Sequence, residues 1–145
     1  MQDFPHNYRA AADATHTGNV ELSSEGVIAI QSAGPPEFGG PGDQWSPETL
    51  LVATVADCFI LSFRAIARAS KLDWTSLSCK VVGTLDRIDR TTRFTKFDVT
   101  AELLVPTGTD EAKSLRLLQK AEDACLITNS LIADSHLNAT VQIDE

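Results

Sequence analysis

The feature that most constrains the fold is an apolar segment near the middle of the chain that begins with a strong helix start. In Ser46-Pro47-Glu48, serine can cap a free amide, proline is tolerated at the first helical position, and glutamate favours the positive end of the dipole. No helix breaker follows until about Ser70, and apolar residues occupy nearly every position from Leu50 to Ala56. The pattern predicts a long helix that needs cover on most of its circumference.

Short segments of alternating apolar residues precede this helix and predict three antiparallel strands near residues 8–12, 20–22 and 27–31. Turn signals separate the three segments. Residues 32–44 are so rich in proline and glycine that we expect a long loop there, without helix or strand.

Two more strands are predicted after the helix, at residues 77–88 and 93–105, joined by a polar turn. A second helix begins after Asp110, and its expected apolar stripe is Leu115, Leu118, Ala121, Ala124 and Cys125. A last strand is expected at residues 137–143. The order β-β-β-α-β-β-α-β is an α+β pattern, and the length fits a single domain over residues 1–145.

Charge and hydropathy exclude several classes of partner. A net charge of -8 repels phosphate backbones, so we expect no nucleic acid. The longest apolar stretch, Leu50 to Ile60, is interrupted by Asp57 and is too short to cross a bilayer, and the N-terminus shows no targeting pattern. We therefore expect a cytoplasmic protein without a membrane partner. Helices that are apolar on most sides also need more cover than one sheet provides, which predicts a homodimer.

Three cysteines, Cys58, Cys79 and Cys125, indicate cytosolic thiols rather than a structural disulfide framework. No pair has C-x-x-C spacing and the histidines form no ligand-spaced cluster, so no metal or cofactor is expected. Cys58 lies in the long helix and Cys125 near the end of the second, so the two thiols meet if the helices pack. The alternative is that both are small apolar core residues.

Two motifs around these cysteines resemble those of the OsmC/Ohr family, the osmotically inducible protein C-like and organic hydroperoxide resistance proteins. Residues 39–58, GGPGDQWSPETLLVATVADC, show the glycine-rich loop, the Pro-Glu helix start and the Ala-x-Cys ending of that family. Residues 125–131, CLITNSL, resemble its second-cysteine segment. The resemblance implies an OsmC-like fold, with two central helices packed on sheets in an intertwined homodimer and active sites at the interface.

The resemblance also implies a thiol-dependent peroxidase that acts in oxidative-stress defence. Cys58 would be the peroxidatic thiol that attacks an organic hydroperoxide, and Cys125 the resolving thiol that forms a disulfide with it before further oxidation. A lipoylated protein or a similar dithiol would reduce that disulfide by exchange. Two alternatives remain: an OsmC-like dimer without enzymatic activity that binds a small apolar or electrophilic ligand, and a redox sensor with weak peroxidase activity.

Peroxidases of this family hold an arginine near the reactive thiol with the glutamate of the Pro-Glu motif. Glu48 fits that glutamate, although it could simply complement the helix dipole. No arginine occurs between Arg9 and Arg64, and Leu126 replaces the usual proline after the second cysteine. The candidates for a substitute cation are Arg9, Arg87, Arg90 and Arg93.

Four aromatic residues are candidates for an apolar pocket that holds the organic part of a hydroperoxide: Phe38, Trp45, Phe59 and Phe63. The alternative is that these residues belong to the core. We expect Cys79 to be a packed thiol on a strand and His136 to touch solvent.

Overall fold

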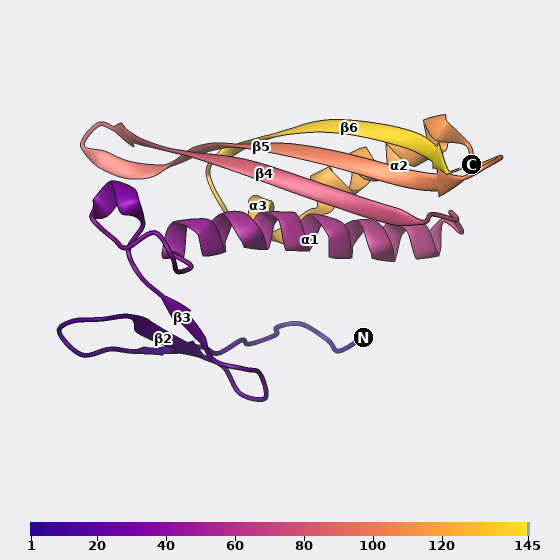
Figure 1. Cartoon of the computed structure of the whole chain (residues 1–145). Coiled ribbons are helices and arrows are strands. Elements are labelled where there is room, and N and C mark those ends of the chain that lie inside the picture. Colours follow the sequence, from indigo (N-terminus) through magenta and orange to yellow (C-terminus); the bar gives the residue numbers. More distant parts are fainter. Residues whose placement is uncertain (145) are drawn as a thin grey trace. The chain divides into compact units, whose positions relative to one another are not determined.

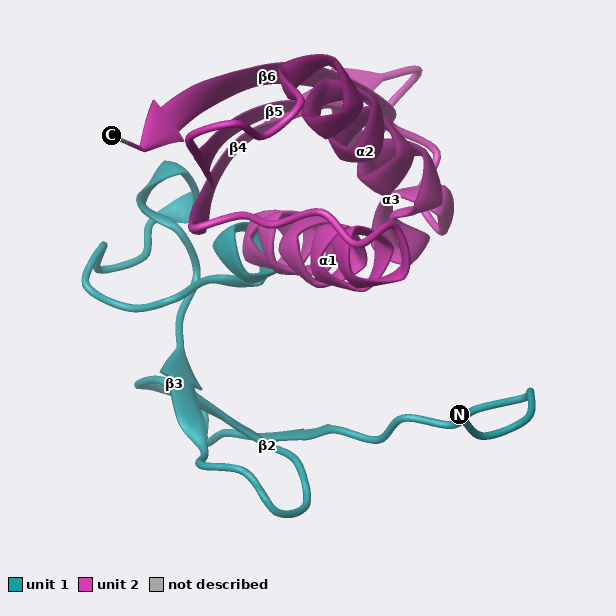
Figure 2. Cartoon of the chain, turned by 90° about the vertical axis from the view of Figure 1, so that its right-hand side faces the viewer, with its two compact units in different colours: residues 1–50 teal, residues 51–145 magenta. Residues whose placement is uncertain are grey.

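The computed structural model describes residues 1–144 and divides the chain into two compact units. Figure 2 colours them separately: the first unit is Met1–Leu50 and the second begins at Leu51. Together the units contain the predicted order of three strands, a long helix, two strands, a second helix and a final strand, with short helical turns added. The α+β prediction is therefore confirmed.

The first unit holds a three-stranded antiparallel sheet of β1 (Ala11–Asp13), β2 (Val20–Ser23) and β3 (Ile30–Ser32), in that spatial order. This confirms three antiparallel strands, although β1 and β3 each begin about three residues later than the alternation predicts. Few of their side chains are buried, and the apolar residues Val27 and Ile28 beside β3 are exposed. Among the described residues, those of the hydrophobic core all belong to the second unit.

The predicted loop contains one helical turn, the 3-10 helix η1 (Pro36–Phe38), which corrects the expectation that no helix occurs there. The proline at its first position already has a helical φ, so a single turn forms at little cost. The loop then folds tightly on itself, because a Cβ on Gly40 would lie 1.6 Å from the carbonyl oxygen of Gly34. Only glycine fits at that position.

The long helix, α1 (Pro47–Ala69), begins where its sequence signals predict. The Ser46 hydroxyl accepts a hydrogen bond from the Thr49 N–H at 3.1 Å, and the Thr49 hydroxyl accepts one from the Ser46 N–H at 2.9 Å. This reciprocal pair is a capping box with threonine at the third helical position. The helix ends in a left-handed residue, Lys71, followed by a bond from the Leu72 N–H to the Ala67 carbonyl at 2.9 Å.

The second unit is built on a three-stranded sheet with the spatial order β4-β5-β6 (Figure 1). Its strands are β4 (Ser76–Ile88), β5 (Thr91–Pro106) and β6 (Asp134–Asp144). β4 and β5 form an antiparallel hairpin, whereas β6 runs parallel to β5. The parallel return requires a crossover, which is supplied by α2 (Glu111–Ala124) and the short α3 (Leu126–Asn129).

The core of this unit lies between the helices and one face of the sheet. α1 contributes residues spaced by four, so that they share one side of the helix: Val55, Phe59, Phe63 and Ala67. β5 contributes every second residue, as its alternation predicts: Phe97, Val99, Ala101, Leu103 and Val105. The polar residues of β5 face away from the helices, which confirms the expected wet face.

The predicted apolar stripe of α2 is partly wrong. Leu118 and Ala121 are buried as expected, but Leu115 is 43% exposed and Ala124 is also exposed. The buried face is instead rotated toward Ser114 and Leu117. Serine is tolerated there because its hydroxyl donates to the Asp110 carbonyl at 2.8 Å, so that no polar group loses its hydrogen bond on burial.

Within the second unit, only one face of α1 is covered. Its core-facing residues are fully buried, whereas Leu61 on the other side is 53% exposed. The second unit by itself therefore does not supply the cover that the sequence predicts around most of α1. By length and composition α1 is long and apolar enough to cross a membrane, contrary to the expectation from its uninterrupted apolar run. This is weak evidence, because the core helix of a soluble protein has the same length and composition.

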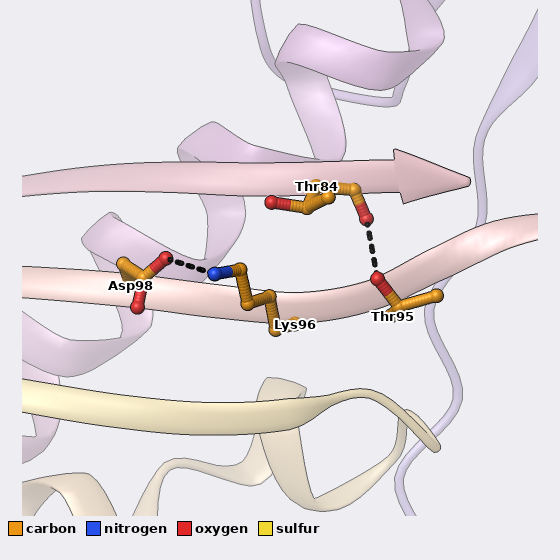
Figure 3. Close-up of polar contacts among 4 residues, drawn as sticks. All are labelled: Thr84, Thr95, Lys96 and Asp98. Carbon is orange, nitrogen blue, oxygen red and sulfur yellow. Dashed lines mark hydrogen bonds and ion pairs between the residues drawn. The ribbon is translucent and has the colours of Figure 1, made fainter.

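A β-bulge in the hairpin changes which residues of β5 face the helices. The register shifts between Thr84 and Leu85, which leaves Thr95 as an extra residue whose hydroxyl donates to the Thr84 carbonyl at 3.3 Å (Figure 3). Beyond the bulge Phe94 turns to the inner side and stacks on Phe97, with ring centroids 5.4 Å apart. On the outer side Lys96 pairs with Asp98 at 3.6 Å (Figure 3).

Close approach of α1 to the hairpin predicts that Gly83→Ala is destabilising. A Cβ at this position would lie 2.8 Å from a methyl group of Val52 and 3.0 Å from the Phe94 ring. Because both side chains are packed, we expect a loss of about 1–3 kcal/mol in the free energy of unfolding, measured by urea denaturation. Gly34→Ala is the matched control, since a Cβ there meets no atom within 4 Å. Equal denaturation midpoints for the two variants would contradict the close approach.

Candidate functional site

The two cysteines singled out by the sequence motifs occupy different kinds of position. Cys58 lies on α1 next to the fully buried Phe59 and is itself only partly buried, with its sulfur 3.9 Å from the Ser62 hydroxyl one turn later. Cys125 lies at the junction of α2 and α3, where it ends one helix and begins the next, and is 1% exposed.

The surroundings of Cys125 include the Cys58 thiol. The pKa of Cys125 is raised above its usual value, mainly because the thiol is buried. The hydroxyl and the backbone N–H of Thr128 oppose this rise, whereas the Cys58 thiol adds to it through hydrogen bonding and its charge. A thiol acts on its neighbour in this way only at close range. All three cysteines are free, so the pair is in the dithiol form.

Cys79 lies on β4 and packs at the edge of the hydrophobic core, as expected. Burial, followed by the charges of Glu122 and Cys125, raises the pKa of Cys79 to about 11. Glu122 is itself buried, and its carboxylate accepts a hydrogen bond from the Ser135 hydroxyl. Cys79 is therefore a protonated thiol at neutral pH, and reactive thiol chemistry is disfavoured there.

The carboxylate of Glu48 lies in the first turn of α1, and one of its oxygens is buried without a hydrogen-bond partner among the described residues. Such a group is costly unless a donor reaches it. Within residues 1–144 the only ion pair joins Lys96 to Asp98, so none of the candidate arginines is paired with a carboxylate. All four are exposed: Arg9, Arg87, Arg90 and Arg93.

The four candidate aromatic residues are divided between core and surface. Phe59 and Phe63 are 0% exposed and pack against the sheet, so the structure places them in the core rather than on the wall of an open pocket. Trp45 is half-exposed and lines a cavity of about 400 Å³ together with residues 42–44 and Thr49. Phe38 is exposed and does not line this cavity.

Comparison with known proteins places this arrangement in a family. Residues 40–140 match the family model described as OsmC-like protein. The chain belongs to the OsmC-like family. It is 31% identical over 135 residues to the organic hydroperoxide resistance protein of Xanthomonas axonopodis pv. citri, covering 87% of this chain and 89% of that protein.

Solved structures of OsmC-like proteins share the fold. An OsmC-like protein of unknown function from Vibrio cholerae superposes with a TM-score of 0.85 at 17% identity, covering 94% of this chain and 100% of the other. An organic hydroperoxide resistance protein OsmC from Legionella pneumophila gives a TM-score of 0.74 at 24% identity, covering 97% and 99% of the two chains. At these identities the likeness establishes the fold.

One cavity of this OsmC-like chain was not anticipated from its sequence. It measures about 260 Å³ and has one charged residue, Arg93, among apolar ones: Leu51, Phe94, Leu131, Ile132 and Ala133. Leu51 lies seven residues before Cys58, which puts it two turns away on the same side of α1. Simple alternation assigns Phe94 to the polar face of β5, and only the bulge at Thr95 brings it into this cavity.

The environments of the three thiols predict an order of reaction with iodoacetamide. At pH 8 about one Cys79 in a thousand is a thiolate, since its pKa is about 11 and the thiolate is the reactive form. Cys125 is buried, and so we expect Cys58 to be alkylated first. Labelling of Cys79 rises only as the pH approaches 11. Peptide mass spectrometry at timed intervals measures all three, and equally fast labelling of Cys79 and Cys58 at pH 8 would refute this order.

Proposed function

We propose that this chain reduces organic hydroperoxides, with Cys58 as the attacking thiol and Cys125 as the resolving thiol. The proposal is supported by the pairing of a partly exposed Cys58 on α1 with a buried Cys125 at the junction of α2 and α3, whose pKa the Cys58 thiol helps to raise. The 31% identical protein from Xanthomonas, an organic hydroperoxide resistance protein, supports this choice of substrate.

The difference in burial supports the assignment of roles. Cys58 is partly exposed and can meet a substrate, whereas Cys125 is 1% exposed and can be reached only by its neighbour. The Cys58 thiolate attacks the distal oxygen of ROOH, the O–O bond breaks, and the alcohol ROH leaves after protonation. Cys125 then attacks the Cys58 sulfenic acid, and water leaves as the disulfide forms.

The cycle closes with an external dithiol, a lipoylated protein or a similar molecule, which reduces the Cys58–Cys125 disulfide by exchange. No further cofactor is needed, because the electrons come from the dithiol. A reducing cytoplasm suits a pair of this kind, since it keeps the resting thiols reduced.

A second copy of the chain is part of the proposal. The outer face of α1, with exposed Leu61, and the apolar residues near the first sheet remain uncovered in one chain. The buried Glu48 oxygen lacks a donor among the described residues. A homodimer would cover these surfaces, and it would allow an arginine to reach Glu48 from either copy, the candidates being Arg9, Arg87, Arg90 and Arg93.

Loss of Cys58 tests the chemistry directly. We expect Cys58→Ser to abolish turnover of cumene hydroperoxide with dihydrolipoamide, because it removes the attacking sulfur. Cys79→Ser is the matched control and should keep the wild-type rate, since Cys79 is a packed, protonated thiol.

Cys125→Ser should allow Cys58 to be oxidised once and then over-oxidised to sulfinic acid, detected by mass spectrometry. Equal turnover by wild type and Cys58→Ser would refute the proposed reaction.

Size measurements test the dimer. We expect light scattering to give twice the chain mass of 15.6 kDa, and Leu61→Glu to shift the protein toward monomer by placing a charge on the outer face of α1. Val82→Glu is the control, because Val82 is 65% exposed on the polar side of the sheet and should leave the dimer intact. A wild-type protein that scatters as a monomer would overturn this part of the proposal.

The apolar cavity beside Phe94 favours a second candidate function, the non-enzymatic binding of a small apolar or electrophilic ligand by an OsmC-like dimer. A co-purifying small molecule together with slow alkylation of Cys58 would select it. Rapid turnover of cumene hydroperoxide that depends on Cys58 would select the peroxidase.

A further inference from the structure

We propose that the Ser62 hydroxyl donates a hydrogen bond to the Cys58 thiolate and thereby stabilises the sulfur in its reactive, deprotonated form. The inference deepens the proposed function and rests on it, because it assigns a further catalytic residue to the same site. Ser62 lies one turn after Cys58 on α1, and its hydroxyl oxygen is 3.9 Å from the Cys58 sulfur. The contact is local to one helix, where residues four apart are neighbours.

The Ser62 hydroxyl differs in its partner from other hydroxyls in or beside the helices. Such a hydroxyl commonly donates to a backbone carbonyl one turn earlier. Thr54, Ser114 and Ser130 do so, at 2.6, 2.8 and 2.7 Å. Within the described residues, the only hydrogen-bond contact of the Ser62 hydroxyl is the Cys58 sulfur. Because helical side chains lean toward the preceding turn, serine at this position reaches back toward the sulfur.

Loss of the thiol proton fixes the direction of this hydrogen bond. In the neutral pair either atom can donate. A thiolate has no proton and can only accept, so serine becomes the donor. A hydrogen bond to an ionised acceptor is stronger than one between neutral groups, and both residues are partly buried, which limits competition from water. The contact therefore stabilises the thiolate more than the thiol.

The other neighbours of the Cys58 sulfur favour the thiol or have no charge. Cys125 interacts with Cys58 from the junction of α2 and α3, and two negative sulfurs would repel each other. Beside Cys125, Glu122 on α2 and Cys79 on β4 are also acids. So is Asp57, the preceding residue of α1. The residues on the same side of α1, one and two turns away, are uncharged: Leu51, Thr54, Val55, Leu61, Ser62 and Ala65.

The cations that approach α1 from other elements do so at a distance from the sulfur. Arg93 on β5 lines a cavity with Leu51, seven residues before Cys58. Lys113 on α2 donates to the Ser70 carbonyl at 2.9 Å, twelve residues after Cys58. At a rise of 1.5 Å per residue, Leu51 and Ser70 lie about 10 and about 18 Å from Cys58 along the helix. The serine hydroxyl is therefore the donor that the described residues place at the sulfur.

The oxidation step balances without a proton from serine. A lone pair of the Cys58 thiolate forms an S–O bond to the distal oxygen of ROOH, the O–O bond breaks, and its electron pair leaves with RO⁻, which takes a proton from water. The sulfur is oxidised by two electrons to the sulfenic acid, and the hydroperoxide is reduced by two electrons to the alcohol. Ser62 raises the fraction of Cys58 that is thiolate at neutral pH. The same hydrogen bond makes each thiolate a weaker nucleophile, with about half the effect on a logarithmic scale.

Alkylation of Cys58 tests these two opposed effects directly. Wild type and Ser62→Ala are labelled with iodoacetamide from about pH 5 to about pH 10, and peptide mass spectrometry gives the rate at Cys58. Loss of the donor should move the pH of half-maximal rate upward by about one half to one unit. We therefore expect Ser62→Ala to be about two- to threefold slower than wild type at pH 7 and about two- to threefold faster on the high-pH plateau, so that the profiles cross.

Thr54→Val is the matched control, because it removes a hydroxyl four residues before Cys58 on the same helix that bonds a backbone carbonyl instead. It should follow the wild-type profile. Alanine is a better helix former than serine, so Ser62→Ala should keep α1 intact, which circular dichroism checks. Coincident profiles for Ser62→Ala and wild type would overturn the inference. A rate changed by the same factor at every pH would also overturn it, because that is the effect of altered access to the sulfur.

Turnover separates the role of Ser62 from the proposed function. If both hold, kcat/KM for cumene hydroperoxide at pH 7 should be about two- to threefold lower in Ser62→Ala than in wild type. Turnover that depends on Cys58, combined with coincident alkylation profiles, would refute only the role of Ser62. Failure of the wild type to reduce cumene hydroperoxide, combined with profiles that cross, would instead refute only the proposed function.

Discussion

The rest of the second unit depends on the packing of one side of α1 against the inner face of β5. Phe59 and Phe63 enter this contact without exposed surface, and burial of each large apolar side chain contributes about 1.5–3 kcal/mol. Gly83 lets the hairpin come close enough for Val52 and Phe94 to join the same contact. The rotation of α1 about its axis is thereby defined, and with it the position of every other residue on the helix.

The position of Cys58 follows from that rotation. As the residue before Phe59, it lies at the margin of the buried face, where a sulfur is partly shielded and still reachable. Cys125 lies in the crossover between β5 and β6, at the junction of two helices whose backbone hydrogen bonds hold it on both sides. The two thiols thus have unequal surroundings, which gives chemically similar groups different roles in the proposed cycle.

The features that one chain leaves unsatisfied have a common explanation in the proposed dimer. An apolar helix face, an exposed first sheet and a buried carboxylate oxygen without a donor are each costly alone. A second copy would address all three at once. The absence of an arginine between Arg9 and Arg64 would then mean that the cation comes from a position other than the one typical of the family.

Features that depend on neighbours in the chain were predictable, through capping, proline geometry and side-chain periodicity. They are the order of strands and helices, the start of α1 at Ser46 and the alternation of β5. The cysteine motifs likewise indicated the family. Other features depend on strand register and on contacts between distant segments. They are the buried face of α2, the inward turn of Phe94 and the placement of Phe59 and Phe63 in the core. No local pattern encodes these, since a single extra residue at Thr95 reverses which side of the strand its neighbours face.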